Sequence, residues 1–388
     1  MKYDFDTVIN RYNSNSLKYD CASQWGVPED VLPMWVADMD FKTAPEILQE
    51  MQKSVEFGIF GYSVPHAEYY EVVVRWFAER FGWNAKPEWI VKTPGVVFAI
   101  ATAIRTLTKK GDGIMIQQPV YYPFRAAIED NERICINNPL VFKDGRYEMD
   151  YEDMEKKITE NDVKLFILCS PHNPVGRVWS VEELEKTLDI CKRHNVFIIS
   201  DEIHCDFTYA GHTHTVLAKL AEDYLDRIMI CTSPSKSFNL AGLQLSHIFI
   251  PNEEVRKNFQ KELFVIPYDE SGTLALAAGR AAYEKGGAWI EELKLYLYEN
   301  VEYVRLFLQE HLPKVKLVEP EGTYLIWLDF TEYGFSAEEL QQKMLHGAKL
   351  WLDEGTMFGE EGAGFMRVNI ACPRSILEKA MEQMKMVF

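Results

Sequence analysis

Residues 227–243 read RIMICTSPSKSFNLAGL and join a short apolar run to a polar loop that carries one lysine, Lys236. The apolar run up to Cys231 is typical of a buried strand. Open α/β sheets bind ligands just beyond the carboxyl ends of their strands, which is where Lys236 stands. Ser233 and Ser235 beside it are able to donate hydrogen bonds to an anion. A solvated loop lysine is the alternative interpretation, because most lysines are exposed; other stretches of the chain decide between the two.

Composition limits the class of protein. The chain has 388 residues, enough for two domains, and 47% of them are hydrophobic, so an ordered globular protein is expected. A net charge of −18 argues against a nucleic-acid or anionic-membrane partner, since both favour basic surfaces. No apolar run is long enough to span a membrane, and the N-terminus does not resemble a signal peptide.

The seven cysteines lie scattered, without a C-x-x-C pair. This usage predicts a cytoplasmic protein with neither a disulfide framework nor a zinc site. His212 and His214 stand two residues apart in a loop rich in Gly and Thr, and we expect them on the surface rather than in a metal site.

Strands and helices alternate through the first two thirds of the chain. Short apolar runs stand between helical patterns at 89–91, 114–116, 163–168, 196–199, 228–231 and 247–250. Near-continuous apolar strands between helices predict a mostly parallel sheet that is covered on both faces. Beyond Gly272, long helical patterns and three strand patterns predict a second, α+β module. We expect an N-terminal arm and part of the small domain at 1–45, a large ligand-binding domain at 46–285 and a small C-terminal domain at 286–388.

Polar groups follow four of the predicted strands, at positions that a parallel sheet brings to one edge: Tyr121 and Tyr122, Asn173, Asp201, and Ser233 to Lys236. Taken singly, these are ordinary turn residues. A turn at Gly95 also opens a helical pattern, and a helix N-terminus attracts anions. An aromatic ring, an acid, an amide, an imine-forming lysine and an anion site are together what pyridoxal 5′-phosphate (PLP) requires.

Three segments resemble signatures of the fold-type I PLP-dependent enzymes, the aspartate aminotransferase superfamily (class I/II). They are SPHNPVG at 170–176, SDEIH at 200–204 and SPSKSFNLAGL at 233–243. PMWVADMDF at 33–41, FGY at 60–62 and DEIH at 201–204 resemble, more narrowly, the MalY/PatB-type cystathionine β-lyases, also called cysteine-S-conjugate β-lyases. The resemblance covers nearly the whole chain. It implies the PLP-dependent transferase-like α/β fold, with a mostly parallel sheet of the seven-stranded type in the large domain and a smaller α+β domain.

The resemblance also implies roles for individual residues. Lys236 would hold the cofactor as an imine, Asp201 would pair with its pyridine nitrogen, and Tyr121 would stack on its ring; we expect these three to be catalytic. The oxygen atoms of PLP would be bound by Asn173 at the phenolic oxygen, by Gly95, Val96, Val97, Ser233 and Ser235 at the phosphate, and by Tyr62 from a second subunit of a homodimer. His204 is a further candidate for cofactor binding near the phenolic oxygen, with a packed or solvated histidine as the alternative.

The same resemblance implies a substrate site for a small amino acid. Arg367 would clamp the α-carboxylate, because a planar two-pronged donor matches that group, and Tyr121 and Asn173 would also contact the substrate. From their apolar character, we expect the segments around Trp35 and Phe60 to shape the pocket for the leaving group, with Trp35 in contact with the substrate. A surface ion pair is the alternative for Arg367.

The predicted activity is cleavage of L-cystathionine or related cysteine thioethers to a thiol (homocysteine), pyruvate and ammonia by a PLP-dependent C–S β-lyase. Two departures from the aminotransferase pattern favour it: His204 replaces a usual tyrosine, and Gln244 stands where an arginine is frequent. An aminotransferase shares the first half of the mechanism and stays open as an alternative. A non-catalytic regulatory binder is disfavoured by the intact Lys236, Asp201 and Asn173.

Overall fold

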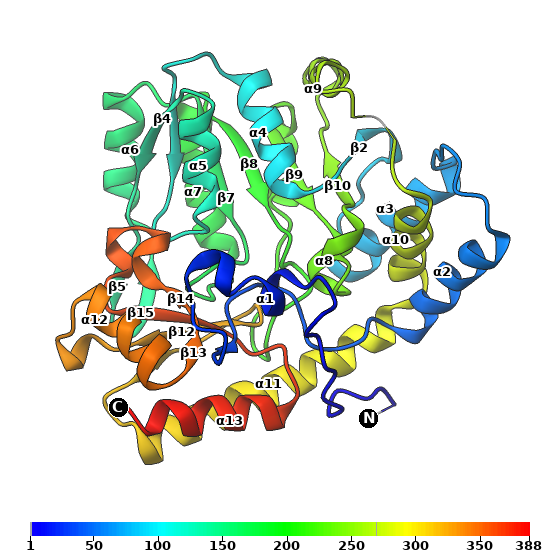
Figure 1. The fold of residues 1–388 in the computed structure, drawn as a ribbon. Coiled ribbons are helices and arrows are strands. Elements are labelled where there is room, and N and C mark those ends of the chain that lie inside the picture. The colour runs from blue at the N-terminus through cyan, green and yellow to red at the C-terminus, as the bar shows by residue number, and fades with distance from the viewer. Residues whose placement is uncertain (1, 269) are drawn as a thin grey trace.

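A seven-stranded sheet forms the centre of the larger part of the molecule. The computed structural model describes residues 2–268 and 270–388 (Figure 1). The strand order is β2 (Ile90–Thr93), β10 (Ser246–Phe249), β9 (Ile228–Thr232), β8 (Phe197–Asp201), β7 (Leu165–Cys169), β3 (Gly113–Ile116) and β4 (Ile134–Asn137). β10 runs antiparallel to both of its neighbours, and all other pairs are parallel. The predicted α/β fold with a mostly parallel sheet is confirmed.

Helices cover both faces of this sheet. One face packs against α4 (Val96–Leu107), α5 (Pro123–Asp130) and α9 (Glu253–Val265), and the other against α3 (Ala67–Phe81), α6 (Tyr151–Glu160), α7 (Val181–Arg193) and α10 (Thr273–Lys285). Successive residues of β9 alternate between the two cores, Met229 in one and Ile230 in the other. Burial of such a side chain stabilises the fold by roughly 1.5–3 kcal/mol, which explains the unbroken apolar strands.

The C-terminal part contains a four-stranded antiparallel sheet. Its strand order is β11 (Lys316–Val318), β12 (Leu325–Asp329), β15 (Phe365–Asn369) and β14 (Asp353–Glu354). The helices α11 (Gly287–His311), α12 (Ala337–Gln342) and α13 (Arg374–Lys385) accompany it. α10 ends at Lys285 and α11 begins two residues later, next to the predicted domain boundary.

The N-terminal segment joins the C-terminal part. β1 (Leu32–Pro33) pairs in parallel with β13 (Leu350–Trp351), and Figure 1 shows the N-terminal segment passing close to α8 (Pro234–Ser237). This pairing is compatible with assigning residues 1–45 to an arm and part of the small domain. The three-part division of the chain stays a prediction.

One strand was not predicted, and the expected position of one histidine is wrong. β4 was missed because this edge strand is partly exposed and contains no fully buried residue, unlike β3 of the same length. His214 does not lie on the surface: it is 3% exposed, and its Nε2 lies 2.8 Å from Oε2 of the buried Glu202. Within the described residues, no group of His, Cys, Asp and Glu is arranged to hold a metal ion.

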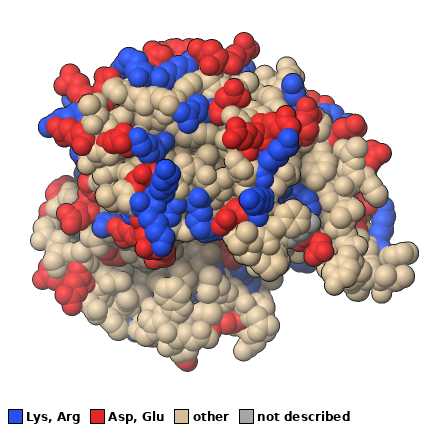
Figure 2. Space-filling model, turned by 90° about the horizontal axis from the view of Figure 1, so that it is seen from above, with Lys and Arg blue, Asp and Glu red and all other residues tan. Residues whose placement is uncertain are grey.

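The surface carries both signs of charge. Figure 2 shows Lys and Arg side chains interspersed with Asp and Glu on the face seen from above. None of the helices in the described part of the chain is long and apolar enough to cross a membrane.

Candidate active site

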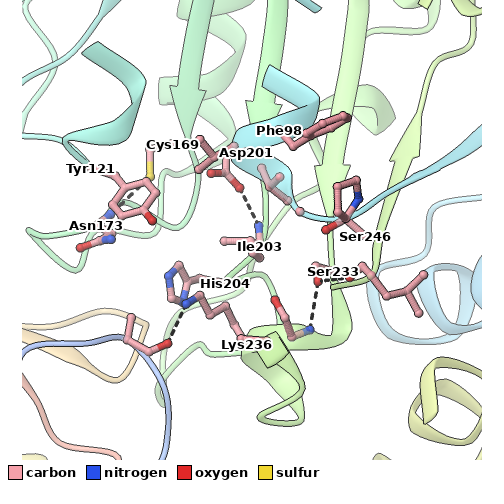
Figure 3. Close-up of a pocket in the computed structure, with 18 residues that line it drawn as sticks. Phe98, Tyr121, Cys169, Asn173, Asp201, Ile203, His204, Ser233, Lys236 and Ser246 are labelled. Atoms are coloured by element: carbon pink, nitrogen blue, oxygen red, sulfur yellow. Dashed lines mark hydrogen bonds between the residues drawn. The ribbon is translucent and has the colours of Figure 1, made fainter. Parts of the chain in front are cut away.

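A cavity of about 200 Å³ opens at the carboxyl ends of β7, β8 and β9 and at the N-terminus of α4. Figure 3 shows its side chains converging from these elements. Ten of the residues predicted for the site line it: Gly95, Val96, Val97, Tyr121, Asn173, Asp201, His204, Ser233, Ser235 and Lys236. Residues spread over 141 positions of sequence are brought together because the parallel strands end at one edge.

Lys236 enters the cavity from α8, a single helical turn that follows β9. Ser233 caps this turn by accepting a hydrogen bond from the Ser235 N–H at 3.0 Å. The Lys236 Nζ donates to the Ala37 carbonyl oxygen at 2.6 Å. Burial, opposed by the negative charge of Asp38, lowers the pKa of Lys236 to about 8. The amine is therefore neutral in a large fraction of molecules at mildly alkaline pH, as a base or nucleophile requires.

Asp201 ends β8 and is 4% exposed. One carboxylate oxygen accepts the Ile203 N–H at 3.1 Å, and the other has no hydrogen-bond partner among the described residues. Burial raises the pKa of Asp201 to about 7, although the hydrogen bond to Ile203 and the charge of Lys236 both lower it. A buried carboxyl group with no ion-pair partner among the described residues is suited to a protonated ring nitrogen, whose charge would stabilise its ionised form.

Asn173 and Arg367 contact each other at the cavity wall. The Arg367 Nη1 donates to Asn173 Oδ1 at 3.1 Å. Because a guanidinium only donates, the amide oxygen of Asn173 faces it and the amide NH₂ is left free to donate elsewhere. Asn173 lines the cavity, so this NH₂ is available to an oxygen of a bound molecule.

Arg367 itself is almost completely buried on β15. Its Nη2 donates to the Trp35 carbonyl oxygen at 2.8 Å and to Asp353 on the neighbouring strand. The guanidinium also lies 5.0 Å from the centre of the Phe358 ring. Its Nε is buried and has no hydrogen-bond partner in the part of the chain that the structure describes, and a buried unsatisfied donor of this kind points to a ligand. The alternative of a surface ion pair for Arg367 is wrong, since the side chain is 3% exposed.

The N-terminus of α4 forms the other end of the cavity. Gly95 is the N-cap and contributes no side chain, and a Cβ built there would meet no atom within 4 Å. The first N–H groups of the helix therefore border open space, an arrangement that binds anions. Ser233 donates its hydroxyl hydrogen to the Leu245 carbonyl at 2.7 Å, whereas the Ser235 hydroxyl has no partner among the described residues. Ser235 is thus the better placed of the two serines for an anion.

Tyr121 and His204 complete the walls. Burial raises the pKa of Tyr121, so its hydroxyl remains protonated. Burial and the nearby charges of Lys236 and Arg367 lower the pKa of His204 well below its ordinary value. The neutral imidazole has a buried Nδ1 that finds no hydrogen-bond partner within residues 2–268 and 270–388, which leaves it free to bond a ligand.

Three predicted residues do not line the cavity: Arg367, which contacts the lining residue Asn173, and Trp35 and Tyr62. The indole of Trp35 stacks on Trp351, with ring centres 4.4 Å apart, and only its backbone carbonyl reaches Arg367. Tyr62 is 93% exposed in the irregular segment between α2 (Pro45–Phe57) and α3. The structure therefore places the Trp35 ring beside the site and leaves Tyr62 outside the cavity of its own chain.

Several lining residues were missed from the sequence. They are Ala37, Pro94, Phe98, Cys169, Ile203, Ala241, Leu245 and Ser246. Cys169 had a detectable signal, because it ends the strand that is paired in register with Asp201. For Ala37, the only signal in the sequence was its place in the motif at 33–41. Its contact with Lys236 is made by its backbone carbonyl and not by its side chain.

Comparisons with known proteins agree with this geometry. The sequence profile of the class I and II aminotransferases matches residues 29–384. The chain is 43% identical to cystathionine beta-lyase PatB of Bacillus subtilis, covering 98% of this chain and 99% of the relative. A PLP-bound structure from Clostridium difficile 630 superposes with a TM-score of 0.97 at 43% identity, covering 99% of both chains. Cystalysin from Treponema denticola, which contains a pyridoxal 5′-phosphate cofactor, has a TM-score of 0.96 at 38% identity over 99% of this chain and 98% of its own.

The chain belongs to the class I and II aminotransferase family. Of the relatives described above, the Bacillus subtilis protein is named a cystathionine beta-lyase and the Clostridium difficile protein a putative aminotransferase, and each is 43% identical to this chain. The family predicted from the three motifs and the narrower MalY/PatB resemblance are both confirmed.

Proposed function

We propose that this protein is a PLP-dependent C–S β-lyase that cleaves L-cystathionine or a related cysteine thioether to a thiol, pyruvate and ammonia. The observation that carries this proposal is the single cavity in which Lys236, Asp201 and Asn173 converge beside the buried Arg367. The relatives named as cystathionine beta-lyases support the same chemistry.

The cavity fits the cofactor in three respects. An open helix N-terminus and the free Ser235 hydroxyl suit a phosphate; a buried carboxylate, Asp201, suits a ring nitrogen; and the NH₂ of Asn173 suits a phenolic oxygen. Lys236 would form the covalent link. When bound, PLP supplies an electron sink that stabilises negative charge at the substrate α-carbon.

The protein's own residues supply positioning and proton transfer. Arg367 presents its unpartnered Nε–H to the substrate α-carboxylate, and Asp201 keeps the ring nitrogen protonated through its negative charge. Lys236, with a pKa of about 8, takes the α-proton. Expulsion of the thiolate from the β-carbon leaves a three-carbon enamine, which takes up water and yields pyruvate and ammonia.

We also propose a homodimer in which Tyr62 of one chain completes the anion end of the cavity in the other. Around Tyr62, the segment from Phe57 to Val64 exposes several large apolar side chains: Phe57 72%, Ile59 64%, Phe60 61% and Val64 70%. Contiguous exposed apolar groups of this kind mark protein interfaces. A second copy would bury them and bring the Tyr62 phenol to the anion end of the cavity.

The test is a product balance with L-cystathionine, added PLP and no 2-oxo acid. We expect pyruvate, ammonia and homocysteine to appear in equal amounts over many turnovers. Lys236→Ala serves as the blank, and its cofactor absorbance should lose the band of the lysine imine. If pyruvate does not form but the protein turns over once a 2-oxo acid is supplied, the site is that of an aminotransferase and the lyase proposal is refuted.

A further inference from the structure

The backbone carbonyl of Ala37 is the meeting point of two side chains that come from distant parts of the chain. It accepts one hydrogen bond from Lys236 Nζ at 2.6 Å and another from the Tyr324 hydroxyl at 3.0 Å. Figure 3 shows Lys236 turned toward the N-terminal segment rather than toward Asp201. The lysine amine thus has one defined protein partner, and that partner is a carbonyl that is itself held.

The peptide units around Ala37 are fixed from the C-terminal sheet. The Asn369 Nδ2 donates to the carbonyls of Val36 and Asp38, each at 2.6 Å, and so spans Ala37. Asn369 is completely buried, and its own Oδ1 accepts the Ala371 N–H at 2.8 Å. The direction of the Ala37 carbonyl is therefore set by β15 on one side and by Tyr324 on the other.

Tyr324 is suited to a fixed donor role. It is 0% exposed, and its ring packs edge-on against Phe207 and His204, with ring centres 5.0 and 5.6 Å away. Burial raises the pKa of Tyr324 far above its ordinary value, so the hydroxyl keeps its proton. Tyr324 does not line the cavity, and we therefore assign it no contact with cofactor or substrate.

We propose that the Ala37 carbonyl orients the Lys236 amine for proton transfer, and that Tyr324 and Asn369 are positioning residues that hold this carbonyl. The inference rests on the proposed function, because it concerns the step in which Lys236 takes the substrate α-proton. A free amine rotates about its last carbon–nitrogen bond, and only one direction points its lone pair at the substrate. Donation of one N–H to Ala37 removes much of this freedom.

The Ala37 carbonyl also stabilises the protonated Lys236 that the proton transfer produces. Once Lys236 has taken the proton it is an ammonium, and its hydrogen bond to the Ala37 carbonyl becomes charge-assisted and stronger. The contact therefore favours the protonated amine more than the neutral one. Misplacement of a reacting group by about 1 Å costs roughly a hundredfold in rate, so a loosened carbonyl has a measurable effect.

The test compares Tyr324→Phe with Tyr209→Phe in the PLP-loaded enzyme. Tyr209 is a matched control: it is 6% exposed, and its hydroxyl donates to the carbonyl of Thr323, next to Tyr324, at 2.7 Å. Exchange of the α-hydrogen of L-alanine with solvent deuterium, followed by NMR, isolates proton transfer because L-alanine has no β-leaving group. We expect exchange to fall by roughly ten- to a hundredfold in Tyr324→Phe, with an unchanged KM for L-cystathionine and a larger α-deuterium isotope effect on kcat.

Tyr209→Phe should retain the exchange rate and the isotope effect of the unaltered enzyme, whatever it does to thermal stability. As a readout independent of activity, a crystal structure of cofactor-free Tyr324→Phe should show the Lys236 Nζ to Ala37 oxygen distance beyond hydrogen-bond reach, above about 3.5 Å. An exchange rate within about twofold of both other proteins, or an unchanged distance, would overturn the inference. A failure of the unaltered enzyme itself to exchange the α-hydrogen would instead refute the proposed function.

Discussion

The carboxyl edge of the large sheet and the segment that carries Tyr62 differ in how far their side chains are exposed to solvent. At the sheet edge, Asp201 and Asn173 are 4% exposed and are held by hydrogen bonds to their neighbours. Tyr62 is 93% exposed and lies among apolar side chains that are also in solvent. The groups proposed for the chemistry are thus complete within one chain, whereas the phenol proposed for the phosphate has no position in the site of its own chain.

This difference separates two kinds of prediction. Changes at the sheet edge should abolish or slow the reaction without altering assembly, because Asp201 and Asn173 are buried and hydrogen-bonded within their own chain. Changes at the exposed segment should weaken cofactor binding and pairing of two copies while the chemistry is preserved.

Replacement of the lysine has the largest expected effect. Lys236→Ala removes both the covalent link and the base, and we expect kcat to fall by at least about a thousandfold, measured as pyruvate release. Lys219→Ala, which removes an exposed lysine, is the control and should keep full activity. Appreciable turnover by Lys236→Ala would show that a different group is the base.

Removal of the buried negative charge comes next. Asp201→Asn keeps the size of the side chain but loses the charge that holds the ring nitrogen protonated, and we expect kcat to fall by roughly a hundredfold. Circular dichroism should show an unchanged fold, and Asp162→Asn on the surface should have no effect. Equal activities of Asp201→Asn and the unaltered protein would remove Asp201 from the proposed chemistry.

The exposed phenol should affect binding more than turnover. Tyr62→Phe deletes one hydroxyl, and a hydrogen bond to a charged phosphate is worth about 1.5–3 kcal/mol, so we expect PLP to bind roughly ten- to a hundredfold more weakly. Equilibrium dialysis measures the loss, with Tyr12→Phe as an exposed control. If PLP affinity is unaltered while kcat falls, Tyr62 acts in the chemistry and the contrast between the two regions is wrong.

The pH dependence provides the finest test. Burial lowers the pKa of Lys236 to about 8, so the amine is neutral above this pH and protonated below it. A base must be neutral to take a proton, and kcat should therefore fall about tenfold per unit as pH drops below about 8. Tyr62→Phe should show the same fall in kcat over the same pH range, because the phenol does not touch the base. If kcat of Tyr62→Phe begins to fall at a different pH, the separation of the two regions is wrong.

The same contrast explains what the sequence could predict. Asp201, Asn173 and Lys236 follow apolar strands, and the parallel sheet places strand ends together, so their convergence was predictable. The role of the Ala37 carbonyl was not, because a backbone acceptor leaves no trace in residue type. The burial of His214 was also missed, since its partner Glu202 is twelve residues away and loop composition alone suggested solvent. The Trp35 ring stacks on Trp351, a contact between segments 316 residues apart that periodicity does not reveal.

The most direct measurement is activity in mixed dimers of Lys236→Ala and Tyr62→Ala, prepared with different affinity tags and purified as the hybrid. If Tyr62 serves the cavity of the other chain, the hybrid contains one site with neither change and one site with both. We predict that it regains about half of the unaltered activity at limiting PLP, although each parent is impaired. A hybrid no more active than the mean of its parents would contradict a site shared between two chains.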